Sequence, residues 1–377
     1  MIPFNKPHLT GRELQYIRHA HALGRLAGDG FYTKKTQQWM QNTFGVPLSL
    51  LTHSATAAIE MMAILSRVAP GDEVIMPNYT FVSTANAFVL RGAVPVFVDV
   101  RSDTLNINER HIERAITKKT KAIVPVHYAG VGCEMDVIGT LAKKNKLLVL
   151  EDAAQGFLAT YRDKYLGTIG DMSAFSFHET KNIISGEGGA LLLNKSKYSE
   201  RAKIIWEKGT NRNKFFLGLV DKYTWVDIGS SYLPGEITAA FLMAQLDKAV
   251  QINKKRMSLW NRYHKELKDL EKNGHLRRPI MPDHVKHNAH LYYVLTNSAK
   301  ERIGFMNSLK ERGILAVTHY VPLHSSPGGR KFCRTSGSMN VTNRVADTLV
   351  RLPLFYDLTS REQSEVLQAI HDYYKRI

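Results

Sequence analysis

Lys181 is the residue whose setting points most directly to chemistry. It lies between two largely apolar runs, where a solvated surface lysine is not expected. Upstream, the apolar run of residues 147–150 ends in two adjacent acids, Glu151 and Asp152. A lysine that can act as a nucleophile, and an acid that can pair with a pyridinium nitrogen, are the two groups that a pyridoxal phosphate (PLP) site requires.

The sequence offers a candidate residue for each of the functions that a PLP site requires. Lys181 can bond to the cofactor aldehyde and afterwards carry a proton to and from the substrate carbon. Asp152 can keep the ring nitrogen protonated, but it could instead cap a helix beginning at Ala153, and Glu151 is a competing acid. Gln155, three residues after Asp152, can hydrogen-bond the ring hydroxyl.

A phosphate group needs backbone N–H groups at a helix start together with hydroxyls. Ser54, Ala55 and Thr56 follow a short apolar run and open a helix-forming segment, so we expect them to form this cradle. The alternative is an ordinary helix capped by Ser or Thr. Ser176 is a further hydroxyl candidate, since it precedes Lys181 on the same strand or turn.

An aromatic ring should cover the open face of the cofactor. Tyr79 and Phe81 follow a predicted strand and could do so, although core packing is the usual role of such residues. His178 could contact substrate or simply pack near Lys181.

The elements that must position these residues alternate between strands and helices. Strand-length apolar runs separated by helix-length amphipathic segments are typical of a mostly parallel sheet covered by helices. The runs are residues 73–76, 94–98, 122–126, 147–150 and 190–193. We therefore predict an α/β fold.

The pattern changes near Gly235. A long helical stretch begins at Ile237 and runs on towards Trp260, and we expect it to connect two domains. Beyond it lie strand candidates at residues 291–295 and 315–320 and an amphipathic helix from about Ser360. We predict a large domain of residues 1–250 and a smaller α+β domain of residues 251–377.

Composition is that of a globular protein, apart from its charge. The chain has 377 residues, of which 44% are hydrophobic, and a formal net charge of +17. Its basic residues are dispersed in short clusters, and this dispersion is most typical of a solvated surface. Attraction of anionic substrates is the second interpretation, and nucleic-acid binding is the third. Cys133 and Cys333 have no metal-ligand spacing, and no window is apolar enough for a membrane span, so we expect no metal site and a cytoplasmic location.

Taken together, these motifs resemble the DegT/DnrJ/EryC1/StrS sugar aminotransferases, which are PLP enzymes of the aspartate aminotransferase fold (fold type I). The motifs that carry the resemblance are Ser54-Ala55-Thr56, Pro77-Asn78-Tyr79-Thr80-Phe81, Glu151-Asp152-Ala153-Ala154-Gln155, Ser176 to Lys181 and Gly186-Glu187-Gly188-Gly189. The resemblance implies that Lys181 binds the cofactor aldehyde, that Asp152 pairs with the pyridinium, and that Phe81 stacks on the ring. It implies that Gln155 holds the ring hydroxyl and that Ser54, Thr56 and Ser176 bind the phosphate.

The resemblance also implies substrates and partners. Asp29, in a Gly-Asp-Gly loop, and His319, Tyr320 and His324 match segments that contact substrate. Some members move the amino group of L-glutamate to the 4-keto carbon of dTDP-4-dehydro-6-deoxyglucose, for enterobacterial common antigen. The segments that resemble these members are residues 71–77, 80–93, 124–131, 208–212 and 221–225. A homodimer with sites at the interface is expected.

Three alternatives stay open on the sequence. Relatives that dehydrate the sugar carry histidine in place of the lysine, so Lys181 argues against that chemistry. Transamination of a 3-keto sugar or another nucleotide carrier is not excluded, and a non-enzymatic regulator or nucleic-acid binder is suggested only by the charge. Ser231 stands where many relatives have an asparagine that the neighbouring subunit donates to the phosphate.

Overall fold

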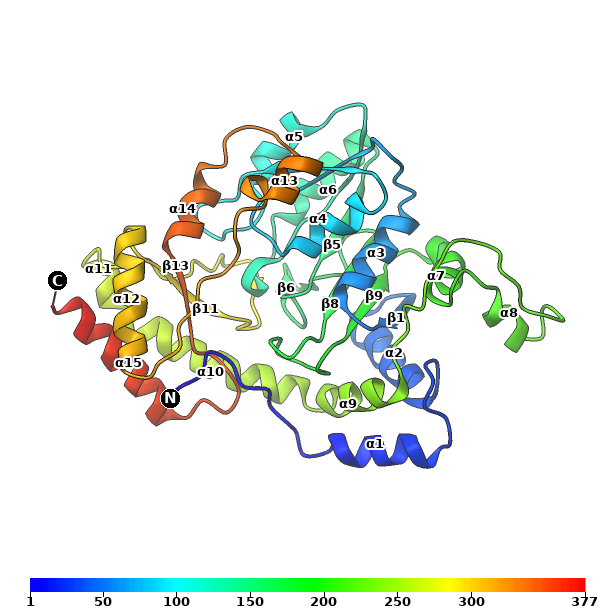
Figure 1. The fold of residues 1–377 in the computed structure, drawn as a ribbon, viewed down its shortest axis with the longest axis horizontal. Coiled ribbons are helices and arrows are strands. Elements are labelled where there is room, and N and C mark those ends of the chain that lie inside the picture. Colours follow the sequence, from blue (N-terminus) through cyan, green and yellow to red (C-terminus); the bar gives the residue numbers. More distant parts are fainter. Residues whose placement is uncertain (377) are drawn as a thin grey trace.

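A single large mixed sheet organises the computed structural model, which describes residues 1–376 (Figure 1). Its strand order is β1-β9-β8-β5-β4-β2-β3-β12, and β9 alone runs antiparallel to both neighbours. The strands are β1 (Leu48–Thr52), β2 (Glu73–Pro77), β3 (Val94–Val98), β4 (Thr120–Ile123), β5 (Leu148–Asp152), β8 (Met172–Ser176), β9 (Gly189–Leu193) and β12 (Arg334–Thr335). The predicted α/β class is confirmed.

Both faces of this sheet are apolar because helices cover both. Leu50 and Leu191 pack under α3, α4 and α7, whereas their chain neighbours Leu51 and Leu192 pack under α2 and α9. This alternation follows from the two-residue period of a strand. The helices of this part are α1 (Glu13–Ala22), α2 (Phe31–Phe44), α3 (Ala55–Leu65), α4 (Val82–Val89), α5 (Ile112–Ala115), α6 (Met135–Asn145), α7 (Ser199–Trp206), α8 (Arg212–Phe216) and α9 (Glu236–Leu246).

A separate apolar cluster forms in the C-terminal part, where α12 and α15 pack beside a two-stranded sheet (Figure 1). Its members come from residue 259 onwards, except Ile2 at the N-terminus. The elements after α9 are α10 (Ala249–Glu266), α11 (Lys268–Lys272), β10 (Val285–Lys286), β11 (Tyr292–Leu295), α12 (Ala299–Glu311), α13 (Pro327–Phe332), α14 (Asn340–Thr348), β13 (Leu349–Leu352) and α15 (Ser360–Tyr374). The short strands β6 (Thr160–Tyr161) and β7 (Lys164–Tyr165) pair with β10. The division into two domains at residue 250 stays a prediction.

Two predictions about elements are wrong. The helix expected to run from Ile237 towards Trp260 is interrupted at Asp247 and Lys248, so that α9 and α10 are separate helices. Residues 315–320 form no regular strand, because Val317 pairs with β13 through a single bridge at Arg351. The helix predicted from Ser360 is α15.

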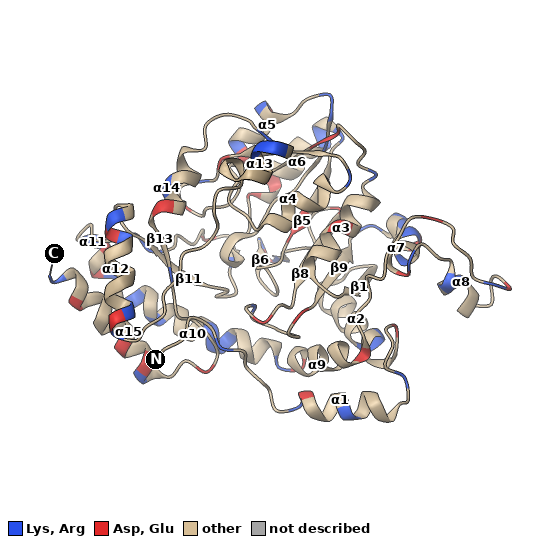
Figure 2. Cartoon of the chain, in the orientation of Figure 1, with Lys and Arg blue, Asp and Glu red and all other residues tan. Residues whose placement is uncertain are grey.

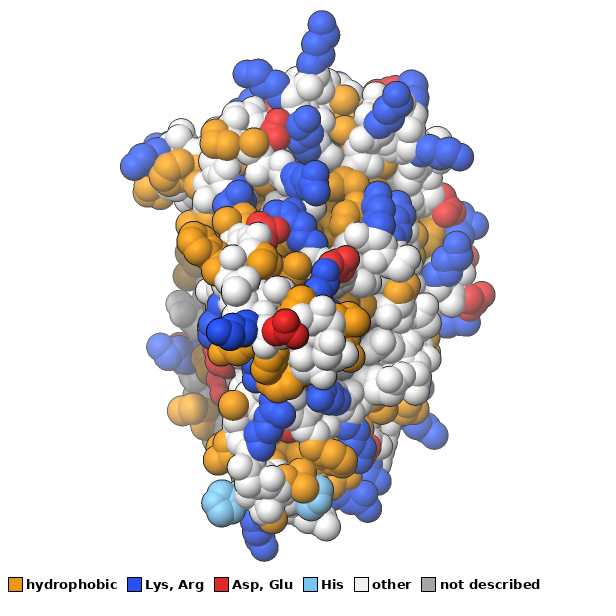
Figure 3. Space-filling view, turned by 90° about the vertical axis from the view of Figure 1, so that its right-hand side faces the viewer, with side chains coloured by type: hydrophobic (Ala, Val, Ile, Leu, Met, Phe, Trp, Pro, Cys, Tyr) orange, Lys and Arg blue, Asp and Glu red, His pale blue; other side chains and the backbone are white. Residues whose placement is uncertain are grey.

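The positive charge is spread over the whole molecule. Lys and Arg lie on most elements of the ribbon, with Asp and Glu among them (Figure 2). On the face in Figure 3, basic side chains alternate with acidic and apolar surface and form no continuous patch. Among residues 1–376, no helix is both long and apolar enough to cross a membrane.

Candidate active site

A cavity of about 850 Å³ lies where the parallel strands end, which is the usual place for a ligand in such sheets. The sequence motifs and the family resemblance together assign a cofactor or substrate contact to thirteen residues, and eleven of them line this cavity. They are Ser54, Ala55, Thr56, Phe81, Asp152, Gln155, Ser176, His178, Lys181, His319 and Tyr320. Residues from separate segments of the chain therefore converge on one cavity.

Lys181 lies in the loop between β8 and β9. This loop is closed by backbone hydrogen bonds from Phe177 to Gly188 (2.8 Å) and from Glu179 to Gly186 (2.8 Å). Burial lowers the pKa of Lys181 to about 8; Asp152 opposes this shift and Arg351 adds to it. A substantial fraction of its amine is therefore neutral, and nucleophilic, near pH 8.

The structure separates the two acids at the end of β5. Asp152 lines the cavity, and it accepts hydrogen bonds from the Thr84 hydroxyl (2.7 Å) and the Ala154 N–H (3.1 Å). Glu151 does not line the cavity: it is fully buried, pairs with His127 (2.9 Å) and accepts three N–H groups of residues 167–170 at 2.5–2.8 Å. No helix follows Asp152, so its alternative role as a helix cap is wrong.

Gln155 is held at both ends of its amide. Its oxygen accepts the Ala129 N–H (2.7 Å), and its nitrogen donates to the Tyr320 hydroxyl (2.8 Å). Ala129 has a positive φ of 58°, so the backbone turns there to present its N–H. The amide of Gln155 is thereby fixed at the edge of the cavity.

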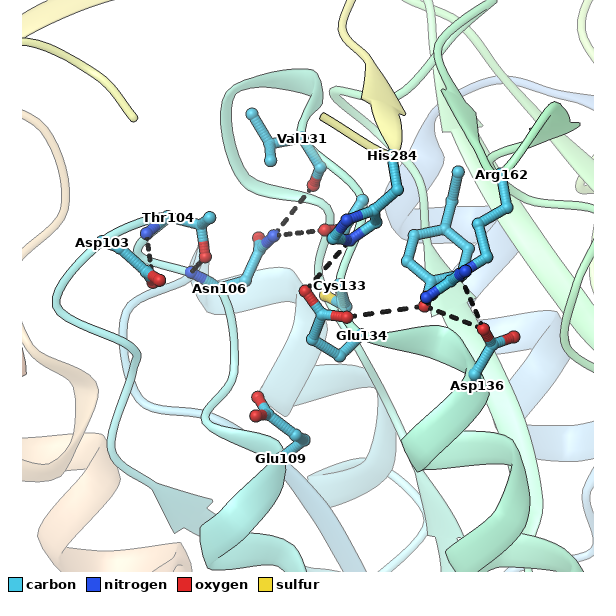
Figure 4. A network of polar contacts seen from close by, with 12 residues as sticks. Asp103, Thr104, Asn106, Glu109, Val131, Cys133, Glu134, Asp136, Arg162 and His284 are labelled. Carbon is cyan, nitrogen blue, oxygen red and sulfur yellow. Dashed lines mark hydrogen bonds and ion pairs between the residues drawn. The ribbon is translucent and has the colours of Figure 1, made fainter. Parts of the chain in front are cut away.

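A polar network outside the cavity secures this turn (Figure 4). Asn106 donates from its amide to the carbonyls of Val131 (2.9 Å) and Gly132 (3.0 Å) and accepts the Tyr128 N–H (2.8 Å). In the same view, His284 pairs with Glu134 at 3.2 Å. The network therefore holds residues 128–134, which present the N–H that Gln155 accepts.

The start of α3 offers a place for a phosphate. Ser54 caps the helix by accepting the Ala57 N–H (3.1 Å), while the N–H groups of Ala55 and Thr56 have no partner among the described residues. A Cβ added to Gly189 would lie 2.4 Å from the Ala55 nitrogen, so only glycine at this position allows β9 to approach the start of α3 so closely. Free N–H groups and hydroxyls at a helix start suit a phosphate.

Phe81, and not Tyr79, faces the cavity. The Phe81 side chain is 56% exposed on the cavity wall, whereas Tyr79 is 1% exposed and packs against Tyr128 and Tyr320. The ring centroid of Phe81 lies 6.4 Å from that of Tyr320. Phe81 can therefore cover a planar ligand, and Tyr79 has the core role that the sequence left open.

Three of the five candidate substrate contacts line the cavity: His178, His319 and Tyr320. Asp29 does not, because it lies beside a smaller hollow of about 180 Å³ near α2 and α7. His324 does not either, since its ring and backbone both bind the side chain of Asn78. Within a single chain, the substrate predictions for Asp29 and His324 are therefore not supported.

Several polar residues of the cavity wall were not candidates in the sequence; Thr84, Arg256, His290 and Arg351 are among them. Arg256 is occupied by the carbonyls of Ala289 (3.1 Å) and His290 (2.6 Å). Burial, with neighbouring cations, lowers the pKa of His290 well below that of an ordinary histidine. None belongs to a local motif with Lys181, so only the fold brings these residues to the site.

The whole chain superposes on a known enzyme. Helicobacter pylori PseC, an aminotransferase involved in the biosynthesis of pseudoaminic acid, matches with a TM-score of 0.92 and 26% identity over 100% of both chains. Fold and site together define a PLP-dependent aminotransferase of fold type I.

Sequence comparison identifies the family. The model of the DegT/DnrJ/EryC1/StrS aminotransferase family matches residues 7–371. The chain is 30% identical to the spore coat polysaccharide biosynthesis protein SpsC of Bacillus subtilis, over 99% of this chain and 97% of that protein. It is 35% identical to the uncharacterized protein MJ1066 of Methanocaldococcus jannaschii, over 90% and 89%. The protein belongs to this aminotransferase family.

Proposed function

We propose that the enzyme moves the amino group of L-glutamate to the 4-keto carbon of dTDP-4-dehydro-6-deoxy-D-glucose, giving dTDP-4-amino-4,6-dideoxy-D-galactose for enterobacterial common antigen. The observation that carries the transamination is that Lys181 and Asp152 line one cavity, beside the start of α3. The choice of sugar and pathway rests on a resemblance to members with this activity, carried by residues 71–77, 80–93, 124–131, 208–212 and 221–225.

The residues present fit PLP. When bound, PLP withdraws electrons from the substrate carbon that loses and regains a proton. Lys181 would hold the aldehyde and then carry that proton, a task suited to an amine whose pKa is about 8. Asp152, held by Thr84, would keep the ring nitrogen protonated. The start of α3, with Ser176, would bind the phosphate, while Gln155 and Phe81 would hold the hydroxyl and the ring face.

Arg351 would bind a carboxylate of the amino donor. Its Nε donates to the Thr318 carbonyl (3.0 Å), and neither terminal nitrogen contacts an acceptor among residues 1–376. A guanidinium with two free, adjacent donors suits a carboxylate. Since Arg256 is already bonded to two carbonyls, Arg351 is the better candidate of the two cavity arginines.

We propose that the enzyme is a homodimer in which residues 208–231 contact the second copy. This segment carries α8, which projects from the body of the chain (Figure 1), and exposes Leu219 (67%) and Trp225 (80%). Such apolar exposure is typical of an interaction surface. Light scattering of the wild type and of Trp225→Ser tests this: we expect a dimer that the substitution weakens, and a wild-type monomer would contradict it.

The decisive experiment is incubation with PLP, glutamate and a panel of dTDP- and UDP-linked keto sugars, followed by NMR of the product. We expect product only from the dTDP-4-keto sugar, with the amino group at carbon 4 in the galacto configuration. An amino group at carbon 3, or a preference for UDP sugars, would instead establish the alternative in which the enzyme acts on a 3-keto or other nucleotide-linked sugar.

A further inference from the structure

Arg351 is held in a constrained position at the cavity wall. Its Nε is bonded to the carbonyl of Thr318, and its backbone exchanges two hydrogen bonds with Val317 (2.8 and 3.1 Å). One face of its guanidinium is covered by the ring of Phe4, whose centroid lies 4.6 Å from the guanidinium carbon. Phe4 itself lines the same cavity.

Phe4 lies on an N-terminal segment that is hydrogen-bonded to three other parts of the chain. Ile2 is buried and exchanges two backbone hydrogen bonds with residues 313–315 (2.8 and 3.0 Å). The Phe4 carbonyl accepts the Leu354 N–H (3.4 Å), and the Asn5 amide donates to the Glu179 carbonyl (3.2 Å), two residues before Lys181. Chain termini are usually loose, so these anchors make Phe4 a fixed part of the site.

We propose that Phe4 is a positioning residue for the amino donor: its ring holds the guanidinium plane of Arg351 so that both terminal nitrogens face the donor's carboxylate. A bidentate pair requires the two planar groups to lie in line, and an aromatic face limits the rotation of the guanidinium. The inference rests on the proposed function, in which the donor is glutamate. The proposal predicts that loss of the Phe4 ring affects the amino donor and not the sugar nucleotide, because only the donor's carboxylate pairs with Arg351.

The test compares Phe4→Leu and Phe4→Tyr in the PLP-loaded enzyme. Leucine keeps an apolar side chain without the ring, and we expect it to raise the KM for glutamate roughly fivefold, the size of one lost cation–π contact. The KM for the sugar nucleotide should not change, and Phe4→Tyr should behave as wild type. Phe332→Leu is a matched control, because that ring lies beside Lys331 (5.0 Å) outside the cavity.

A second measurement is independent of turnover: calorimetric binding of glutarate, an unreactive dicarboxylate, to the same variants. Phe4→Leu should weaken binding in the wild-type background and have no further effect with Arg351→Gln, as a double-mutant cycle requires. Equal losses for both substrates, an unchanged glutarate affinity, or additive effects of the two substitutions would overturn the proposal. A wild type that binds glutarate but does not react with glutamate would contradict the proposed donor and leave the role of Phe4 standing.

Discussion

Replacing Lys181 by methionine should stabilise the cofactor-free protein at neutral pH. Burial lowers the pKa of this lysine from 10.5 to about 8, against the opposing effect of Asp152. At pH 7 the amine is charged in both folded and unfolded chains, but the folded environment disfavours that charge. A shift of this size corresponds to about 3 kcal/mol of unfolding free energy, which Lys181→Met would recover apart from small packing changes.

The sign of the effect follows from proton binding. Between about pH 8 and pH 10.5 the unfolded chain holds more protons at this lysine than the folded chain, so the site makes wild-type stability rise with pH across that window. The variant has no such group. Its advantage over the wild type should therefore be largest below pH 8 and shrink as the pH approaches 10.

Thermal unfolding at pH 7 and pH 9.5, at one protein concentration and without PLP, checks this. With an unfolding entropy of about 2.1 cal/mol/K per residue, 3 kcal/mol corresponds to a Tm increase of roughly 4 °C at pH 7. Lys118→Met is the matched control, because Lys118 is exposed and should give no pH-dependent difference. The reasoning is refuted if Lys181→Met does not raise the Tm at pH 7, or if its effect is equal at both pH values.

Three further predictions concern the residues around Lys181. Asp152→Asn should leave the fold intact and lower kcat at least a hundredfold. Glu151→Gln should mainly lower the free energy of unfolding, by about 3 kcal/mol, because it weakens a buried network of hydrogen bonds. Urea unfolding and steady-state kinetics distinguish the two effects, and near-normal turnover by Asp152→Asn would assign the pyridinium role to another residue. Thr84→Val should weaken PLP binding about tenfold in absorbance titrations, because it removes a hydrogen bond to the Asp152 carboxylate. The control Thr348→Val, at a buried hydroxyl outside the cavity, should bind PLP as the wild type does. Equal PLP affinities of Thr84→Val and the wild type would contradict this prediction. If the charge of +17 attracts the anionic sugar nucleotide, its KM should rise with salt at nearly constant kcat, and a KM that is flat from 50 to 300 mM salt would exclude this.

The sheet was predictable because its strands are short apolar runs between helices. Four of the five predicted runs overlap strands by three or more residues, and the run 122–126 overlaps β4 at Ala122 and Ile123. The break between α9 and α10 could not be predicted from the sequence, because the apolar period continues across Asp247 and Lys248 without proline or glycine. Ala249 and Ile252 at the start of α10 still pack in the same apolar cluster as α9, and from Leu259 onwards α10 packs in the cluster of the C-terminal part.

The candidate cofactor residues could be singled out in the sequence because each belongs to a local pattern: an acid after a strand, small residues before a helix, a lysine between strands. Arg351 and Phe4 have no such pattern, since each is one residue of a short segment at opposite ends of the chain. They meet because residues 313–317 pair with the N-terminal segment on one side and with β13 on the other. Contacts of this kind depend on tertiary structure and leave no local signal.

The choice between Glu151 and Asp152 shows what the sequence lacked. Adjacent residues of a strand point to opposite faces, so one acid had to face away from the cavity. Leu150 packs with α3 and α4, and Val149 packs with α5 and α6. Asp152 shares the face of Leu150, so Asp152 and the start of α3, the candidates for the pyridinium partner and the phosphate site, lie on the same side of the sheet. The strand period is readable from the sequence, but which helix covers which face is decided only by the fold.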